Sequence, residues 1–505
     1  MTQSSPRNRP DKLDNPADKS GRYSSGAIFC ILALLLIFIA NHSANYACAN
    51  SYQNIPCIIH IDTTFSIDGS LTLEQVVEKA KEKGVKVVIP TDDALTEAEY
   101  GIFPFRKIIK KKIEEVSVLK IGSEKYLNEI KILNEKNKDM LIIPGIETTA
   151  FYRWTGNPFK ENLTMQNWHK HFLIVGLSEP AQYRELPISG NESNSGKFDA
   201  SKLWGGIILI LGIYLLSYWK KAWIIIFIGI GSIIYNFPFK SLPFDNYKDY
   251  GELPYQNLIN YVNKNNGLIF YAHPEAINWS NPVQIGPVSV RTKPCTNSLL
   301  QTYDYTGFAY FREGYRDAGK PGGLWDEVLG EFCAGKRNRP VWAIGELDYI
   351  NDKESGEIDT VQNILLLKDF TETSVIDCLK TGRFYVLYKT KPDNFPAIIK
   401  KLVLESENST AQMGEILKCK STPKLTLCIT TGDSKSHKIN INIIRNGEIV
   451  KSDKILTPAE YTYMDKTSEG EGIQGQKSYY RIELISDSGA KIVTNPIFWG
   501  SGLPQ

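Results

Sequence analysis

The sequence has little of what several common kinds of site require. No C-x-x-C pair occurs among its eight cysteines, which excludes a zinc-ribbon type of metal site. The formal net charge is only +2, and no Lys/Arg-rich stripe is interleaved with aromatic residues, so no nucleic-acid partner is expected. Histidine is also scarce, with six residues in a chain of 505, and the place of each one therefore carries weight.

Six short apolar runs each carry a histidine or an acid at one end. The runs are IPCIIHID, VKVVIPTDD, MLIIPGIE, HKHFLIVGL, GLIFYAHPE and VWAIGELD. Each run predicts a buried strand, and polar side chains at strand ends gather at one rim of a sheet or barrel, where they can surround metal ions. The side chains at these ends that could bind a metal are His60, Asp62, Asp92, Asp93, Glu147, His171, His273 and Asp348.

The N-terminus predicts a targeting segment. Residues 1–25 are polar and basic, a composition that predicts a disordered leader. The apolar run at 26–41 follows it and predicts either a retained signal anchor or a cleaved signal peptide. The residues leave both alternatives open.

A second apolar region, 203–237, predicts a transmembrane helical hairpin inside an insertion at 179–252. Each half has about 16 residues, or about 24 Å of helix, and its only charges, Lys220 and Lys221, lie at the turn. The alternative is a buried helical hairpin of a soluble protein. If the basic leader and the two lysines lie in the cytoplasm, the main domains are periplasmic or extracellular and membrane lipid is a partner.

Between 55 and 395 the pattern alternates strand and helix. A capping box, Thr72 to Gln75, begins an amphipathic helix, and the lysine-rich segment 107–138 predicts one or two helices. Repeated βα units with continuous apolar strands predict a parallel sheet or barrel that is covered on both faces. From 396 to 505, β-rich runs and a hairpin signal at Asn446-Gly447 predict a small all-β sandwich.

The segment HIDTTFSIDGSLT, from His60 to Thr72, resembles the opening motif of the PHP-domain metal-dependent hydrolases, a superfamily named for polymerases and histidinol phosphatase. That motif runs H-x-H, then S-D-G-S-L-T and a capped helix. Further matches follow in the order of the family: TDD at 91–93 for T-D-H, GIE at 145–147 for G-x-E, AHP at 272–274, and GELD at 345–348 for G-S-D-x-H. The C-terminal half is similar to the CehA/McbA-type branch in LKTGRFYV at 379–386, RNG at 445–447, YYR at 479–481 and NPI at 495–497.

The resemblance implies an α/β fold: a distorted (βα)7 barrel, interrupted by the transmembrane hairpin and followed by the sandwich. It also implies two or three divalent metals (Mn, Mg, Fe or Zn) at the barrel rim. Asp62 and Asp93 stand where the family has histidine, which shifts the preference from zinc towards Mn²⁺, Mg²⁺ or Ca²⁺. Ile350 stands in place of the last ligand histidine and cannot bind metal. The implied metal ligands are His60, Asp62, Asp68, Asp93, Glu147, His171, His273 and Asp348.

The function predicted from these motifs is a membrane-attached metal-dependent hydrolase, foremost a phosphoesterase, that attacks a small-molecule substrate with a metal-activated water. His273 is also the candidate acid for the leaving group. Several assignments stay open: His169 could replace His171 as ligand, Asp92 could orient a neighbour or cap a turn, and Arg312 or Arg383 could contact phosphate or simply be a surface or packing residue. The alternative function is a catalytically impaired PHP-like domain that serves as an extracytoplasmic ligand-binding, sensing or scaffold module. The sequence does not indicate an oligomeric state.

Overall fold

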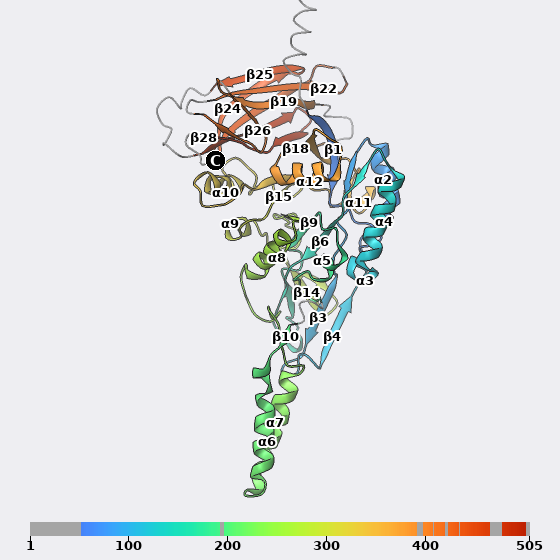
Figure 1. Ribbon diagram of the computed structural model, residues 1–505, viewed down its shortest axis with the longest axis vertical. Helices are drawn as coiled ribbons and strands as arrows, with labels where there is room; N and C mark the ends of the chain where they lie inside the picture. Colours follow the sequence, from blue (N-terminus) through green and yellow to red (C-terminus); the bar gives the residue numbers. More distant parts are fainter. Residues whose placement is uncertain are drawn as a thin grey trace, which may run out of the picture. The chain divides into compact units, whose positions relative to one another are not determined.

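The computed structural model describes residues 52–191, 196–390, 397–407, 409–419, 423–433, 435–464 and 477–500 (Figure 1). They belong to one unit of the chain, Asn50–Gln505. The predicted leader at 1–25 and the predicted signal segment at 26–41 lie outside the described residues. The location of the main domains outside the cytoplasm therefore stays a prediction.

An eleven-stranded sheet joins strands from both ends of the described chain. In it β1 (Gln53–Ile59) lies between β2 (Val87–Ile89), to which it is parallel, and β17 (Val361–Leu367), to which it is antiparallel. Every residue of β2 and β17 is buried, as expected for strands that are covered on both faces. The remaining strands of the sheet are β5 (Leu141–Ile142), β18 (Phe384–Tyr388), β21 (Ile416–Lys418), β23 (Lys438–Arg445), β24 (Glu448–Leu456), β26 (Ser478–Ser486), β27 (Lys491–Thr494) and β28 (Ile497–Gly500).

A five-stranded sheet carries most of the strand ends that matter for the site. Its order is β16-β15-β12-β9-β6, in which β12, β15 and β16 are parallel and β9 is antiparallel to both neighbours. Apolar residues such as Phe172, Ile269 and Phe308 bury its faces in the main hydrophobic core. The bounds are β6 (Gly145–Thr149), β9 (His171–Val175), β12 (Leu268–Tyr271), β15 (Gly307–Phe311) and β16 (Trp342–Gly345).

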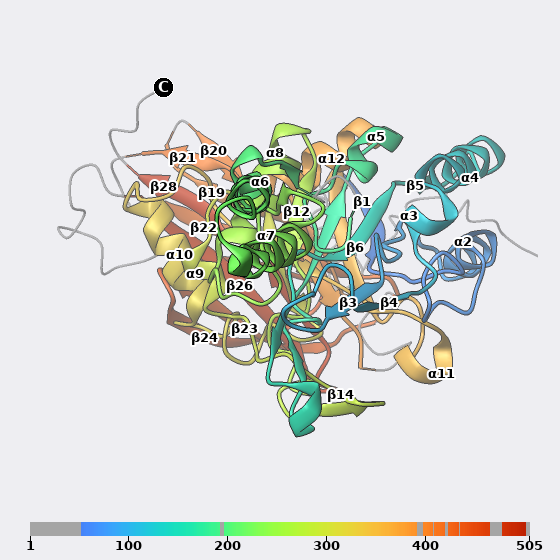
Figure 2. The same ribbon diagram turned by 90° about the horizontal axis from the view of Figure 1, so that it is seen from below.

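Helices pack against these sheets, and one of them is the amphipathic helix predicted after the capping box. α2 (Leu73–Glu82) begins at the predicted capping box: Thr72 Oγ1 accepts from the Gln75 amide at 3.2 Å, and Gln75 Oε1 accepts from the Thr72 amide at 2.9 Å. α2 lies beside α4 (Ser123–Lys136), and Lys136 pairs with Glu74 between them (Figure 2). The other helices are α3 (Val118–Ile121), α5 (Pro180–Arg184), α8 (Leu253–Lys264), α9 (Ser298–Gln301), α10 (Leu324–Cys333), α11 (Asp352–Ser355) and α12 (Glu372–Thr381).

The lysine-rich segment 107–138 is only partly helical. Its first part forms β4 (Lys110–Glu114), which pairs antiparallel with β3 (Glu97–Gly101). Lys110 reaches Glu99 at 2.6 Å and Lys112 reaches Glu97 at 2.7 Å, so opposite charges face each other across the ladder. The sequence pattern within one segment does not indicate its pairing with another strand. The prediction of helix was therefore wrong for the segment that forms β4.

The apolar region 203–237 forms two adjacent helices, α6 (Trp204–Leu215) and α7 (Trp223–Asn236), joined by a short turn that carries Lys220 and Lys221 (Figure 1). Glycines let the two backbones approach: a Cβ at Gly229 would lie 2.6 Å from the Leu209 amide nitrogen. Within the described residues, no helix combines the length and the apolar character needed to cross a membrane. The predicted transmembrane hairpin was wrong, because α6 and α7 end after 12 and 14 residues.

The predicted (βα)7 barrel was wrong as well as the hairpin. The strands lie in several separate sheets and many of their pairs are antiparallel, so the fold is mixed α/β and not a single (βα)7 barrel. A small four-stranded sheet, for example, stands apart from the two large ones. It consists of β7 (Arg153–Thr155), β8 (Thr164–Gln166), β13 (Val283–Ile285) and β14 (Val288–Arg291), and a two-stranded pair is formed by β10 (Lys197–Phe198) and β11 (Lys240–Ser241).

From residue 397 onward the described elements are strands. A second core lies between the end of the eleven-stranded sheet and a four-stranded sheet of order β20-β19-β22-β25. Asn446 and Gly447 both have positive φ, 50° and 90°, and form the two-residue turn between β23 and β24, which confirms the predicted hairpin. The four strands are β19 (Ala397–Glu405), β20 (Thr410–Gln412), β22 (Lys424–Thr431) and β25 (Ala459–Met464).

Candidate metal centre

Four strands from different parts of the chain deliver predicted ligands to one place. His60 follows β1, Glu147 lies in β6, His273 comes after β12 and Asp348 comes after β16. Backbone hydrogen bonds tie two of these segments together: the Leu347 amide donates to Ile59 O at 3.0 Å, and the Tyr349 amide donates to His60 O at 3.0 Å. The strand ends therefore meet as the apolar runs predicted.

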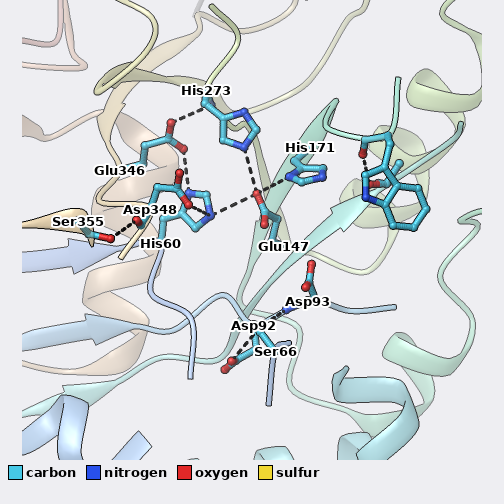
Figure 3. A network of polar contacts seen from close by, with 12 residues as sticks. His60, Ser66, Asp92, Asp93, Glu147, His171, His273, Glu346, Asp348 and Ser355 are labelled. Carbon is cyan, nitrogen blue, oxygen red and sulfur yellow. Dashed lines mark hydrogen bonds and ion pairs between the residues drawn. The ribbon is translucent and has the colours of Figure 1, made fainter. Parts of the chain in front are cut away.

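Six of the eight predicted ligands form two groups, each with its candidate ligand atoms within 4.8 Å of one another. Glu147 joins the two groups, since its Oε1 lies 2.8 Å from His171 Nδ1, 3.3 Å from His273 Nε2 and 3.2 Å from His60 Nε2 (Figure 3). We call the two sets the Glu147 group and the His60 group. The Glu147 group is Glu147, His171 and His273, and the His60 group is His60, Asp62 and Asp348.

The backbone is strained at three of these residues. The φ values are 71° at His60, 26° at His273 and 49° at Asp348. They fall in the left-handed backbone region, which residues other than glycine rarely adopt. Such conformations cost about 1–3 kcal/mol each and persist where the surrounding structure over-determines them, typically at functional sites. The strained backbone therefore places these three side chains in the cluster at a cost in local conformational energy.

The donor set fits a divalent cation. Among the described residues, His60 Nε2 and His273 Nδ1 are buried without a hydrogen-bond partner. His60 is fully buried, and its Nε2 lies between the carboxylates of Glu147 and Asp348, at 3.2 and 3.7 Å. An unpaired buried nitrogen is costly, and three imidazoles with three carboxylates form a mixed nitrogen and oxygen set that suits Mn²⁺, Fe²⁺ or Zn²⁺.

Burial also shapes the acids and bases of the cluster. Burial, with help from neighbouring carboxylates, raises the pKa of Asp62 well above its ordinary value. Burial alone would raise the pKa of Glu147, but the charges and hydrogen bonds of the surrounding histidines outweigh it and hold that pKa well below its usual range. For His273, burial lowers the pKa, but the hydrogen bond to Glu147 and the charges of the nearby carboxylates outweigh it and raise the pKa to about 9. The cluster thus concentrates charge of both signs in a buried place.

The two remaining predicted ligands lie near the groups without joining them. Asp68 and Asp93 line a cavity of about 400 Å³ together with the Glu147 group, Asp62 and Asp348, and Ile350 lines it as well. Burial and the charge of Glu147 raise the pKa of Asp93 to about 6. Seven of the eight predicted positions therefore line one cavity. The eighth, His60, is fully buried, with its Nε2 3.7 Å from Asp348. The roles of all eight as ligands stay predictions.

The structure separates several alternatives that the sequence left open. The ring of His169 stacks on Trp279 with centroids 3.5 Å apart, and His169 belongs to neither group, so the geometry favours His171 as the ligand. Asp92 is buried and accepts hydrogen bonds from Thr63 N at 2.6 Å and Ser66 Oγ at 3.1 Å, so it orients the loop after His60.

The two arginines considered for phosphate differ in place. Arg312 lines the cavity, and its guanidinium donates to the carbonyl of Ser355. Arg383 pairs with Asp377 at 2.9 Å and does not line the cavity. Of the two, only Arg312 lies where a substrate of this site could reach it.

Sequence reasoning missed Glu346. This residue is 1 % exposed, and its Oε2 lies 3.0 Å from His60 Nδ1 while its Oε1 accepts from the His273 amide at 2.8 Å (Figure 3). The available signal was its position in the run VWAIGELD, where an acid follows a buried strand directly. It lies on the Nδ1 side of the His60 ring, away from Nε2, and belongs to neither group.

Comparison with known proteins leaves the family open. No protein-family model and no curated protein matches the chain. Among solved structures, a two-domain protein from Bacteroides vulgatus ATCC 8482, described as containing a predicted PHP-like metal-dependent phosphoesterase, has a TM-score of 0.34 and 14% identity, over 88% of this chain and 96% of that chain. A protein from Bifidobacterium adolescentis ATCC 15703, described as a metal-dependent phosphoesterase, has a TM-score of 0.26 and 12% identity, over 59% of this chain and 88% of its own. Neither likeness is close enough to assign a family, and the CehA/McbA-type branch stays a prediction.

Proposed function

We propose that this chain is a PHP-like metal-dependent hydrolase that acts on a small phosphate ester. The observation that carries the proposal is the pair of three-residue groups joined by Glu147, whose Oε1 lies within 3.3 Å of three histidine nitrogens. These residues come from strands far apart in the sequence, and three of the six adopt a strained backbone to meet. Backbone strain of this kind is typical of functional sites.

The residues divide the work of binding and proton transfer. The Glu147 group and the His60 group would each hold one divalent ion. Such ions would polarise a phosphoryl oxygen and lower the pKa of a bound water. Arg312 lines the same cavity and is placed to contact a phosphate oxygen. His273 would use Nε2, which faces Glu147, as its ligand atom. Its Nδ1 is buried without a hydrogen-bond partner among the described residues, so its role as the acid for the leaving group stays a prediction.

The proposal predicts metal-dependent turnover by the purified full-length chain. After dialysis against a chelator, we expect hydrolysis of p-nitrophenyl phosphate or of its bis-ester to be lost, and to return when Mn²⁺ is added. Mn²⁺ is the first choice because half of the ligands are carboxylates. The measurement is the release of p-nitrophenolate alongside the metal content of the same sample. The absence of both bound metal and turnover would overturn the proposal.

One observation favours the second candidate, a PHP-like ligand-binding, sensing or scaffold module. Ile350 places an apolar side chain in the cavity wall where the PHP-type motif has a histidine. A protein that binds Mn²⁺ at this site but hydrolyses neither ester would support this candidate over the hydrolase.

A further inference from the structure

We propose that Glu346 is the positioning residue that holds the two candidate metal groups in register. The inference rests on the proposed function, since it concerns the same site. Glu346 contacts one histidine of each group through different carboxylate oxygens: Oε2 faces His60 and Oε1 faces His273. A single buried side chain thus sets the relation between the two groups.

The contact to His60 fixes which ring nitrogen is free to bind metal. Glu346 Oε2 lies 3.0 Å from His60 Nδ1, and a carboxylate in this place accepts the Nδ1 proton. The His60 Nε2 atom is then left with its lone pair, directed towards Glu147 at 3.2 Å. A carboxylate behind a histidine is a common way to fix the tautomer and raise the basicity of a metal ligand.

The contact to His273 holds a strained backbone in place. Glu346 Oε1 accepts from the His273 amide at 2.8 Å, at a residue whose φ is 26°. The ring of His273 lies nearly parallel to that of His60, with an interplanar angle of 24° and centroids 6.0 Å apart. The hydrogen bond compensates the strain and sets where the His273 ring enters the cluster.

Glu346 is itself held rigidly and bridges two sheets. Its amide donates to Phe311 O at 2.7 Å, and the residue is 1 % exposed. His60 follows β1 of the eleven-stranded sheet, whereas His273 follows β12 of the five-stranded sheet. The described strands β1 and β12 do not pair with each other, so the carboxylate of Glu346 supplies a direct link between the two ligand segments.

The substitution Glu346→Gln keeps the shape of the side chain and removes its ability to accept at both ends. An amide has one oxygen and one NH₂ group, so it can satisfy the His273 amide or the protonated His60 Nδ1, but not both. If the NH₂ group faces Nδ1, the proton of His60 moves to Nε2 and blocks the metal-binding nitrogen. We expect Mn²⁺ affinity to fall about 10–100-fold, the usual effect of losing such a support.

The control is Glu275→Gln, which changes another buried glutamate of the same region. Glu275 is 4 % exposed and accepts from the amides of Arg316, Asp317 and Ala318, without a hydrogen bond to any predicted ligand among the described residues. Glu275→Gln therefore removes buried hydrogen bonds, as Glu346→Gln does, but does not change the hydrogen bonds of His60 and His273. We expect its Mn²⁺ affinity to stay within threefold of the wild type.

The test measures Mn²⁺ binding by full-length wild type, Glu346→Gln, Glu346→Asp and Glu275→Gln, with thermal unfolding of each protein with and without Mn²⁺. Glu346→Asp keeps the charge but is too short to reach both partners, so it covers the case in which the Gln variant does not fold, and its affinity should also fall at least tenfold. Wild-type affinity in the Glu346 variants would overturn this inference while leaving the hydrolase proposal standing. Failure of the wild type to bind Mn²⁺ would instead overturn both.

Discussion

Replacing Glu147 by glutamine is expected to lower kcat/KM for Mn²⁺-dependent ester hydrolysis by about 10³-fold, equivalent to about 4 kcal/mol of lost transition-state stabilisation. Glu147 belongs to one group and also contacts the other, because its Oε1 lies close to nitrogens of His171, His273 and His60. The amide has nearly the same size but carries no charge, so the substitution removes the anionic centre of the site without opening a hole. The measurement is steady-state hydrolysis together with metal content.

The matched control for this prediction is Glu313→Gln. Glu313 lines the same cavity but belongs to neither group, and its side chain is partly exposed. We expect its kcat/KM to remain within about tenfold of the wild type, because removing a nearby charge changes only the field of the cavity. A Glu147→Gln variant that keeps both its metal and wild-type turnover would contradict the central place given to this carboxylate.

The second large effect concerns stability and lies away from the site. Arg481 of β26 is fully buried, and its Nε and Nη2 donate to Asp326 of α10 at 2.9 and 2.7 Å. Its Nη1 also donates to Glu483 at 3.1 Å, and Tyr479 donates to Asp326 at 2.8 Å. We expect Arg481→Ala to lower the free energy of unfolding by about 3–5 kcal/mol, because it leaves buried carboxylates without their partner.

An arginine whose partner is exposed to solvent serves as the comparison for this buried pair. Arg383 also pairs with an aspartate, Asp377, but the side chain of Asp377 is 58 % exposed. Arg383→Ala should therefore cost about 1 kcal/mol or less. Urea denaturation of both variants, followed by circular dichroism, measures the difference. Equal losses for Arg481→Ala and Arg383→Ala would mean that the buried network does not link α10 to β26 in the way described.

The strand-end ligands could be predicted because their signal is local. An apolar run that ends in a histidine or an acid indicates both the strand and the rim at which it ends, and this was sufficient to find His60, Glu147, His273 and Asp348. The capping box at Thr72 is equally local and appears as predicted. The PHP-type motif added Asp68, which the apolar runs alone did not indicate.

What could not be predicted depends on contacts between distant segments. Glu346 acts on His60, 286 residues away in the sequence, and no pattern around either residue reveals the pairing. The strand β4 was mistaken for helix because its partner β3, and not its own sequence, decides its conformation. The hairpin 203–237 was mistaken for membrane-spanning because hydropathy measures the apolar run, whereas the helices within it end after 12 and 14 residues.

Location of bound Mn²⁺ tests the central claim most directly. Crystals of the full-length chain grown with Mn²⁺ would show the ions through their anomalous scattering. The account predicts two ions in the cavity, one bound by His60, Asp62 and Asp348 and the other by Glu147, His171 and His273. A cavity without an anomalous peak, or ions bound by none of these six side chains, would contradict it.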